Sequence, residues 1–349
     1  MNAIAKLPAQ PGTPLPRIAL ALGDPAGIGP EIALKAALDP RVRAACRPLL
    51  VGDRGALEFH ARACGIDVPL HVVQSSSDAP ASDGITLLDL DQFREEPLAP
   101  GEVRAAHGRA AVEAASVAIR AALDGHVEAV AACPQTEFAI KAAGIAFDGY
   151  PTFVARCTGT PEEDTFLMLC FDDKRIVHTT LHVGLRQAID LVTKARVLRV
   201  LEATRAVLVS LGVATPRIAV SGLNPHASEH GMFGNEEATI IEPAMEEARA
   251  QGILCEGPFG ADTMFQKPGY DAFVVMVHDQ GHLAAKLLAT NRTAGMTIGT
   301  PVLFSSVAHG SALEIAGMNK ASPEAVVEAL LRLAGAALRA RAPAAAYPQ

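Results

Sequence analysis

Three histidine pairs recur along the chain with the same internal spacing. They are His178 and His182, His226 and His230, and His278 and His282. Neutral imidazoles are common ligands of zinc and similar divalent ions, and three of them leave one coordination position open for a substrate oxygen. Such a centre suits polarisation of an alcohol or a ketone.

The competing interpretation is that these are unrelated surface or capping histidines. Their positions count against it, because His226 and His278 each follow an apolar strand candidate and His182 lies at the end of another. In α/β enzymes the ligands lie at such strand ends. The spacing alone does not select one member of each pair.

Two charged residues lie close to the third pair. Asp279 follows His278 directly, and Lys286 lies further along the same segment. Beside a metal, these groups could carry protons or orient the substrate. The alternative is a solvated charged loop.

Two glycine-containing segments are typical of ligand-binding turns. GDPAGIGPE, residues 23–31, joins a predicted strand to a helix and could cradle an anion, although it lacks the G-x-G-x-x-G order and the P-loop ending. HGSALEIAG, residues 309–317, has small residues where a flat cofactor ring could approach the backbone. A tight structural turn and an ordinary helix start are the respective alternatives.

The elements that must position these residues alternate between short apolar runs and longer Ala-rich amphipathic runs, which predicts an α/β fold. The predicted strands are Ile18–Leu22, Pro48–Val51, Ile85–Leu88, Ala129–Ala132, Arg175–Thr180, Arg217–Ser221, Ala272–Val277 and Met296–Leu303. The predicted long helices are Arg104–Leu123, Arg186–Leu211, Glu236–Gln251 and Pro323–Arg341.

Composition narrows the class of protein. Of the 349 residues, 50% are hydrophobic and 19% charged, which is typical of a globular chain. A net charge of -8 argues against nucleic-acid binding. The six cysteines form no C-x-x-C pair and are expected to be reduced, and the first sixteen residues fit neither a signal peptide nor a membrane anchor. We therefore expect a cytoplasmic enzyme with no membrane partner.

Five segments occur in the order found in the 4-hydroxythreonine-4-phosphate dehydrogenase family, which the chain resembles from about Ile18 to Ala334. They are GDPAGIGPEI, GLNPHASE, GADTMFQ, YDAFVVMVHDQG and VAHGSALEIAG. The family is similar to the isocitrate and isopropylmalate dehydrogenases. The resemblance implies a two-lobed α/β/α fold with a cleft between the lobes. After a tail of residues 1–16, residues 17–137 and 290–342 would form the cofactor-side lobe, and residues 138–289 a central lobe with the metal site and dimer contacts.

The same resemblance implies roles for individual residues. His182, His226 and His278 would bind one divalent ion, zinc or else iron, cobalt or manganese, at the interface of a homodimer. NAD or NADP would bind near His309, Gly310, Ser311, Ala312 and Gly317. Lys286 would contact the substrate or transfer a proton, and we assign Asp279 and Asp262 to orienting or relay roles.

Departures from the family pattern concern the substrate pocket. Members with phosphate substrates carry Gly-His-Thr-Glu where residues 149–152 read Gly-Tyr-Pro-Thr, and their asparagine and arginine fall on Gly295 and Phe304. Losing four polar contacts while gaining Tyr150, Pro151 and Phe304 predicts a flat, partly apolar substrate. We therefore assign Tyr150, Gly295 and Phe304 to substrate binding.

The chain also resembles a decarboxylating branch of the family. We expect NAD-linked, metal-dependent oxidation of a small carboxylated secondary alcohol. One alternative is an enzyme that acts on a phosphorylated hydroxy acid. The other is a non-catalytic binding protein that has kept the fold. Arg186 and Arg292 are the cations considered for a second carboxylate of the substrate.

Overall fold

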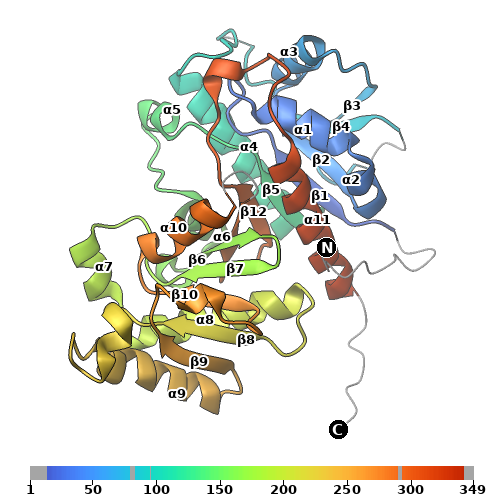
Figure 1. Ribbon diagram of the computed structural model, residues 1–349. Coiled ribbons are helices and arrows are strands. Elements are labelled where there is room, and N and C mark those ends of the chain that lie inside the picture. Colours follow the sequence, from blue (N-terminus) through green and yellow to red (C-terminus); the bar gives the residue numbers. More distant parts are fainter. Residues whose placement is uncertain (1–13, 79–82, 95, 290–292, 342–349) are drawn as a thin grey trace. The chain divides into compact units, whose positions relative to one another are not determined.

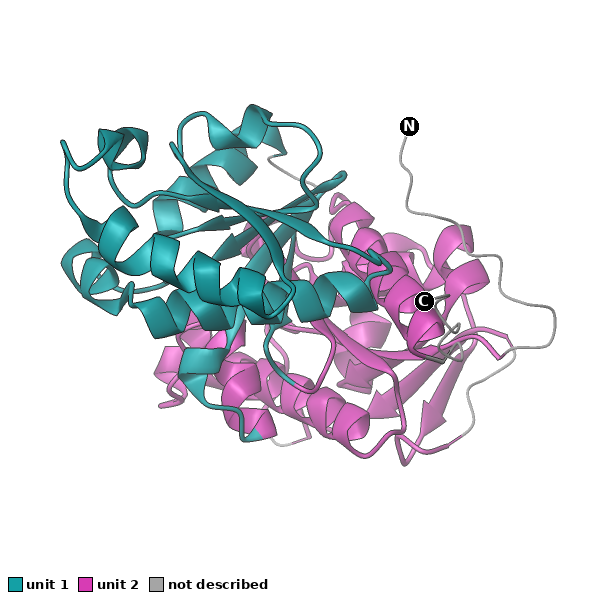
Figure 2. Cartoon of the chain, turned by 90° about the horizontal axis from the view of Figure 1, so that it is seen from below, with its two compact units in different colours: residues 1–5, 159–300 teal, residues 6–158, 301–349 magenta. Residues whose placement is uncertain are grey.

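The computed structural model describes residues 14–78, 83–94, 96–289 and 293–341. Within these ranges the chain forms two compact units, coloured separately in Figure 2: unit 1 is residues 159–300, and unit 2 is residues 14–158 with 301–341. Our predicted lobe edges fall at 137/138 and 289/290 instead. The segment 150–158 packs on a helix of unit 2 and the strand 294–298 pairs within unit 1, which accounts for the difference.

Unit 2 is built on a parallel sheet. In its described residues the strand order is β3-β4-β2-β1-β5-β12 (Figure 1). The bounds are β1 Arg17–Ala21, β2 Arg47–Gly52, β3 Leu70–Val73, β4 Ile85–Asp89, β5 Ala129–Ala132 and β12 Phe304–Val307. Each neighbouring pair of these strands runs parallel. The central strands β1 and β5 are buried almost throughout, as a sheet covered by helices on both faces requires.

Helices cover this sheet and close its core. α4 packs on β1 and β2, while α11 packs on β5 and β12 and also contacts α1; α11 is the dark red helix in Figure 1. The helices of unit 2 are α1 Gly29–Leu38, α2 Pro40–Ala45, α3 Arg54–Cys64, α4 Ala105–Leu123, α5 Glu137–Ala142, α6 Tyr150–Thr158 and α11 Glu324–Arg341. Alternate strand residues and the Ala-rich face of α4 form one core cluster, which includes Phe153 and Phe304.

Unit 1 has a mixed sheet. Among its described residues the order is β11-β6-β7-β10-β8-β9, with bounds β6 Phe166–Phe171, β7 Lys174–His178, β8 Arg217–Ser221, β9 Leu254–Phe259, β10 Ala272–Val275 and β11 Ala294–Ile298. β6 is antiparallel to both of its neighbours, whereas β7, β10, β8 and β9 run parallel. The parallel half brings the carboxyl ends of β7, β10 and β8 to the same edge.

The helices of unit 1 are α7 Leu185–Leu191, α8 Lys194–Ser210, α9 Glu242–Ala250 and α10 His278–Leu288. α8 packs on β7, β10 and β11, and α9 packs on β9. α10 contacts β7 and β10 and contributes Ala285 to a core cluster with Ile176 and Phe273.

The α/β prediction is confirmed, but three predicted elements are wrong in detail. The helix predicted over Arg186–Leu211 is two helices, because the Thr193 side chain accepts a hydrogen bond from the Arg196 N–H and starts α8 anew. The helix predicted over Glu236–Gln251 opens as a π-turn at Glu237–Ile241. The strand predicted over Met296–Leu303 is the two strands β11 and β12, and β3, β6 and β9 were not predicted.

Two further properties bear on the expectations from composition. Within the described ranges, every helix falls short of the length and apolar character that a bilayer span requires. The six cysteines, all of which lie in those ranges, are free.

Gly108 in α4 provides a test of how closely α4 and α5 pack. A Cβ there would lie 2.3 Å from the backbone carbonyl atoms of Ala139 in α5. We expect Gly108→Ala to lower the free energy of unfolding by about 1–3 kcal/mol through overpacking, measured by urea unfolding.

The matched control is Gly335→Ala in α11, where the nearest atom is the flexible end of Arg339 at 3.1 Å. There the better helix propensity of alanine should raise the free energy of unfolding by about 1 kcal/mol. A stabilising effect at both positions would contradict the described α4–α5 contact.

Candidate metal and cofactor site

The three predicted ligands of unit 1 follow three neighbouring parallel strands. His182 comes after β7, His278 after β10, and His226 after β8. β10 lies between the other two strands in the sheet, so all three loops start from one edge. This edge is where ligands bind in open α/β sheets.

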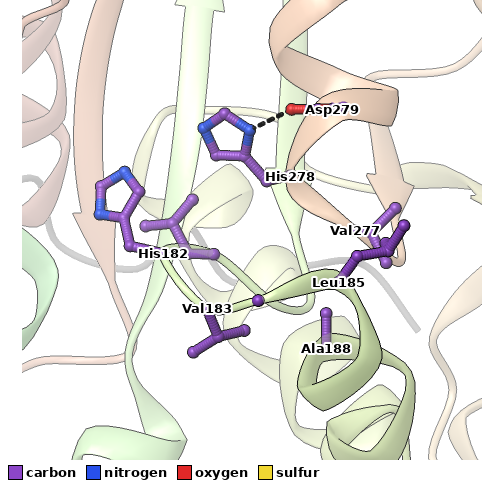
Figure 3. Close-up of a pocket in the computed structure, with 9 residues that line it drawn as sticks. His182, Val183, Leu185, Ala188, Val277, His278 and Asp279 are labelled. Carbon is purple, nitrogen blue, oxygen red and sulfur yellow. Dashed lines mark hydrogen bonds and ion pairs between the residues drawn. The ribbon is translucent and has the colours of Figure 1, made fainter.

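His182 and His278 come together. Their ring centroids are 5.6 Å apart, and two imidazoles bound to one zinc ion have ring centres about 5–6 Å apart at ordinary zinc–nitrogen distances. Both residues line a cavity of about 380 Å³. In Figure 3 the two rings lie beside each other, and apolar side chains such as Val183, Leu185 and Ala188 line the rest of the cavity.

Asp279 orients one of these rings. Its Oδ1 lies 2.6 Å from Nδ1 of His278, shown as the dashed line in Figure 3. A carboxylate on Nδ1 holds the proton there and leaves Nε2 as the basic nitrogen, which is the common arrangement of metal-bound histidines. This contact supports the orienting role predicted for Asp279.

His178 and His282, the other members of these two pairs, pack next to His278. His178 is 1% exposed, its Nε2 is 3.0 Å from Nδ1 of His282, and the His282 ring stacks on His278 with centroids 3.8 Å apart. Burial, together with the neighbouring imidazoles, lowers the pKa of His178 to about 3 and that of His282 to about 4. Both rings are therefore neutral at pH 7, and they pack against His278 without adding charge.

Gly281 makes this packing sterically possible. A Cβ at this position would lie 2.3 Å from Nε2 of His178 and 2.8 Å from a methyl group of Ile176. Glycine therefore lets α10 approach β7 closely enough for His282 to reach His178. The glycine of the H-D-Q-G-H motif is therefore explained by the close contact between α10 and β7.

His226 lies in a separate part of the unit. Its side chain is 63% exposed, its Nδ1 is 3.4 Å from a Glu229 carboxylate oxygen, and its ring contacts Phe233. Asp262 is its neighbour, because both residues approach Gly260. Among the described residues no three histidine, cysteine or carboxylate groups are gathered for one ion. One chain therefore brings together two of the three predicted ligands.

The loop that carries His226 has an unusual backbone. Residues 226–230 all have positive φ, although none is glycine. Such residues cost about 1–2 kcal/mol each and persist only where their surroundings hold them. The backbone that leads into this stretch is held by buried Glu237, whose Oε1 accepts hydrogen bonds from the N–H groups of Leu223 and Asn224, each at 2.8 Å.

Lys286 shares a helix face with His278 and His282. The three residues are spaced four apart along α10, which places them on consecutive turns of one side. The positive charge of Lys286 contributes to the lowered pKa of His282. Lys286 is thus on the same helix face as the predicted metal ligand, as a substrate contact would need.

The two glycine-containing motifs meet in unit 2. Asp24 N–H donates to the Pro134 carbonyl at 2.9 Å, and Ile28 N–H donates to the Ser311 carbonyl at 2.9 Å. The hydroxyls of Ser311 and Thr136 are also hydrogen bonded. The turns after β1, β5 and β12 therefore form one cluster, which the separate motifs did not predict.

Within the predicted cofactor segment, the residues differ in accessibility. Ser311 is buried, Ala312 has a positive φ of 41°, and His309 and Gly310 are less covered, with no atom near a Cβ built on Gly310. Gly317, with φ of 70°, lies beside the ring of Phe59. Their cofactor roles stay predictions.

Tyr150 and Phe304 belong to an aromatic cluster of unit 2. Their ring centroids are 4.8 Å apart, and Tyr150 also contacts Phe147 and Phe153. The Tyr150 hydroxyl donates to the Cys133 carbonyl at 3.3 Å, and burial raises the pKa of this hydroxyl. Phe304 is fully buried and contacts the Tyr150 ring, and its substrate-binding role stays a prediction.

The remaining predicted positions are spread out. Gly295 is buried in β11 opposite Leu169. Arg186 is exposed on α7, and Arg292 lies outside the described residues. The substrate-binding role of Gly295 stays a prediction.

Comparison with known proteins identifies the class. Residues 44–334 match the family described as pyridoxal phosphate biosynthetic protein PdxA, and the chain belongs to this family. One structure of similar fold is a 4-hydroxythreonine-4-phosphate dehydrogenase from Burkholderia phymatum, with a TM-score of 0.81 and 34% identity; the match covers 93% of this chain and 99% of that one. Another is a terephthalate 1,2-cis-dihydrodiol dehydrogenase from Burkholderia xenovorans LB400, with a TM-score of 0.69 and 41% identity; the match covers 92% of this chain and 98% of that one.

Two curated relatives are equally similar in sequence. A 1,2-dihydroxy-3,5-cyclohexadiene-1,4-dicarboxylate dehydrogenase of Comamonas sp is 40% identical over 91% of this chain and 96% of its own length. A protein of Symbiobacterium thermophilum named as a D-threonate 4-phosphate dehydrogenase is 40% identical over 90% and 95%. The matches support a dehydrogenase of the PdxA family and confirm the resemblance inferred from the five segments.

Glu237 was missed by the sequence analysis, and its role can be tested. We expect Glu237→Ala to lower the free energy of unfolding by about 2–4 kcal/mol, because two backbone N–H groups lose their acceptor. Urea unfolding followed by circular dichroism measures the change. Glu246→Ala, on the exposed side of α9, is the control and should stay within about 0.5 kcal/mol. Equal effects of the two substitutions would count against the role of Glu237.

Proposed function

We propose that this chain is a divalent-metal-dependent, NAD-linked dehydrogenase that converts 1,2-dihydroxy-3,5-cyclohexadiene-1,4-dicarboxylate to 3,4-dihydroxybenzoate. The observation that carries the proposal is the pairing of His182 and His278, with Asp279 on the second ring, beside a largely apolar cavity. NADP is the alternative cofactor.

The donor set suits a divalent ion. The separation of the two rings is compatible with a shared ion, and Asp279 Oδ1 contacts Nδ1 of one ring, which would leave its Nε2 for the ion. We assign the third ligand position to His226 of a second copy of the chain, because His226 is exposed and lies apart from the pair. The exposed apolar residues Leu185, Met232 and Leu287 support a homodimer, since both groups of ligands carry such neighbours.

The reaction can be balanced from the substrate. Oxidation at C2 removes a hydride and the hydroxyl proton, leaving a β-keto acid. The C1 carboxylate then leaves as carbon dioxide, and the resulting enol is the aromatic product. When bound, NAD supplies the hydride acceptor and the divalent ion supplies positive charge for the oxygen that becomes the carbonyl.

Side chains at α10 would contact the substrate, transfer its proton and orient a metal ligand. Lys286 lies on the same face as His278, and we assign it to substrate contact and proton transfer. Asp279 keeps the His278 ring in its orientation through the 2.6 Å contact. Asp262 lies near His226, and we assign it the role of orienting the His226 ring.

The substrate assignment rests on Tyr150. The resemblance places a substrate-contacting histidine of the phosphate-using members at this position, whereas the tyrosine hydroxyl donates to the Cys133 carbonyl and its ring packs among aromatic neighbours. A phosphate needs charge-assisted donors, which this cluster does not offer. A flat ring with carboxylates fits the replacement better.

A phosphorylated hydroxy acid is the second candidate substrate, because the relative named for D-threonate 4-phosphate is as similar as the one named for the dicarboxylate. A direct comparison decides between them. With NAD and zinc, we expect the dihydrodiol to yield NADH and 3,4-dihydroxybenzoate, with kcat/KM at least about 100-fold above that for 4-hydroxythreonine 4-phosphate or D-threonate 4-phosphate. Preference for either phosphate ester would overturn the substrate assignment.

Sharing of the ion between two copies predicts complementation. His226→Ala and His278→Ala should each abolish activity alone, because every site lacks a ligand. Co-expression of the two variants should restore about a quarter of the parent activity, since half of the dimers are mixed and each holds one complete site.

His230→Ala, in the same loop as His226, is the control and should keep its activity. If the mixture of the two alanine variants stays inactive although mixed dimers form, the ion is not shared in this way.

A further inference from the structure

Gln280 makes an unusual set of contacts at the start of α10. Its Oε1 accepts hydrogen bonds from the backbone N–H groups of Met276, at 2.9 Å, and Val277, at 3.1 Å. Its Nε2 donates to the carbonyl of Gly222 at 3.1 Å. One carboxamide therefore joins the end of β10 to the loop after β8.

Both segments lead to predicted ligands. Met276 and Val277 directly precede His278, and Gly222 opens the loop that carries His226. Beyond Gly222 the backbone is held by Glu237 and passes into the residues of positive φ. Because the segment between them is constrained, fixing the position of Gly222 also restricts the position of His226.

The contacts require an amide. An amide oxygen can accept from both N–H groups while the amide nitrogen donates to a carbonyl, whereas a carboxylate has no proton to donate. Asparagine is one methylene shorter and would not span both segments. Alanine would leave the Gly222 carbonyl and both N–H groups without this partner.

We infer that Gln280 is a positioning residue that fixes the segments bearing His278 and His226 relative to each other. The inference rests on the proposed metal site, and it adds a side-chain link between the two segments that carry the ligands. Because His278 of one chain and His226 of the same chain would serve different ions of a dimer, Gln280 connects the two sites within each chain. Loss of the link should weaken metal binding without removing any ligand.

The experiment uses the full chain and three variants. Gln280→Ala removes the link, and Gln280→Glu keeps the two acceptor bonds but not the donor. Val200→Ala, on the buried side of α8, is a destabilised control that lies outside both segments in the sequence. Zinc affinity is measured by chelator competition, and backbone order by amide hydrogen exchange of the metal-free proteins.

We expect Gln280→Ala to weaken zinc binding about 10–100-fold, the usual effect of removing a partner that holds a ligand. Gln280→Glu should weaken it less, and Val200→Ala should leave it unchanged at a comparable loss of thermal stability. Exchange should quicken in Gln280→Ala both at residues 276–280 and at residues 222–230.

Zinc affinity within twofold of the parent for Gln280→Ala, or exchange that quickens in only one segment, would overturn the inference. A parent protein that binds no zinc would instead overturn the proposed function. The exchange data would still decide whether Gln280 joins the two segments.

Discussion

The site of unit 1 depends on how closely α10 lies against β7. Gly281 permits this approach, because any side chain there would meet His178. The contact lets His282 bridge from His178 to His278, and it sets the His278 ring 5.6 Å from His182. Buried His178 and half-buried His282, both neutral, thus pack behind a His278 ring that also lines the cavity.

The same sheet edge explains why the third histidine differs. β8 lies on the far side of β10 from β7, and its loop contains five consecutive non-glycine residues of positive φ, followed by Gly231, which also has positive φ. Buried Glu237 fixes the start of this loop by accepting hydrogen bonds from the N–H groups of Leu223 and Asn224. An exposed ligand on a constrained loop is suited to reach outward, which is why a second copy of the chain completes the centre in our account.

Much of the architecture could be predicted from the sequence because strand and helix periods were clear. The histidine-bearing loops were placed correctly after β7, β8 and β10, since apolar runs marked those strands. The break between α7 and α8 was missed because the capping role of Thr193 is a local side-chain contact within a long amphipathic pattern. The contacts of Gln280 with Gly222 and of His282 with His178 were also missed, because these partners lie 58 and 104 residues apart in the chain. The role of Glu237 was missed because its bonds to Leu223 and Asn224 depend on how the loop between them folds.

The account stands on one divalent ion held by imidazoles from two copies of the chain. Anomalous X-ray scattering from crystals of the zinc-loaded protein tests this most directly. It should show one zinc ion per chain, bound by His182 and His278 of one copy and by His226 of another. Zinc bound elsewhere, or bound with these three side chains turned away from it, would contradict the account.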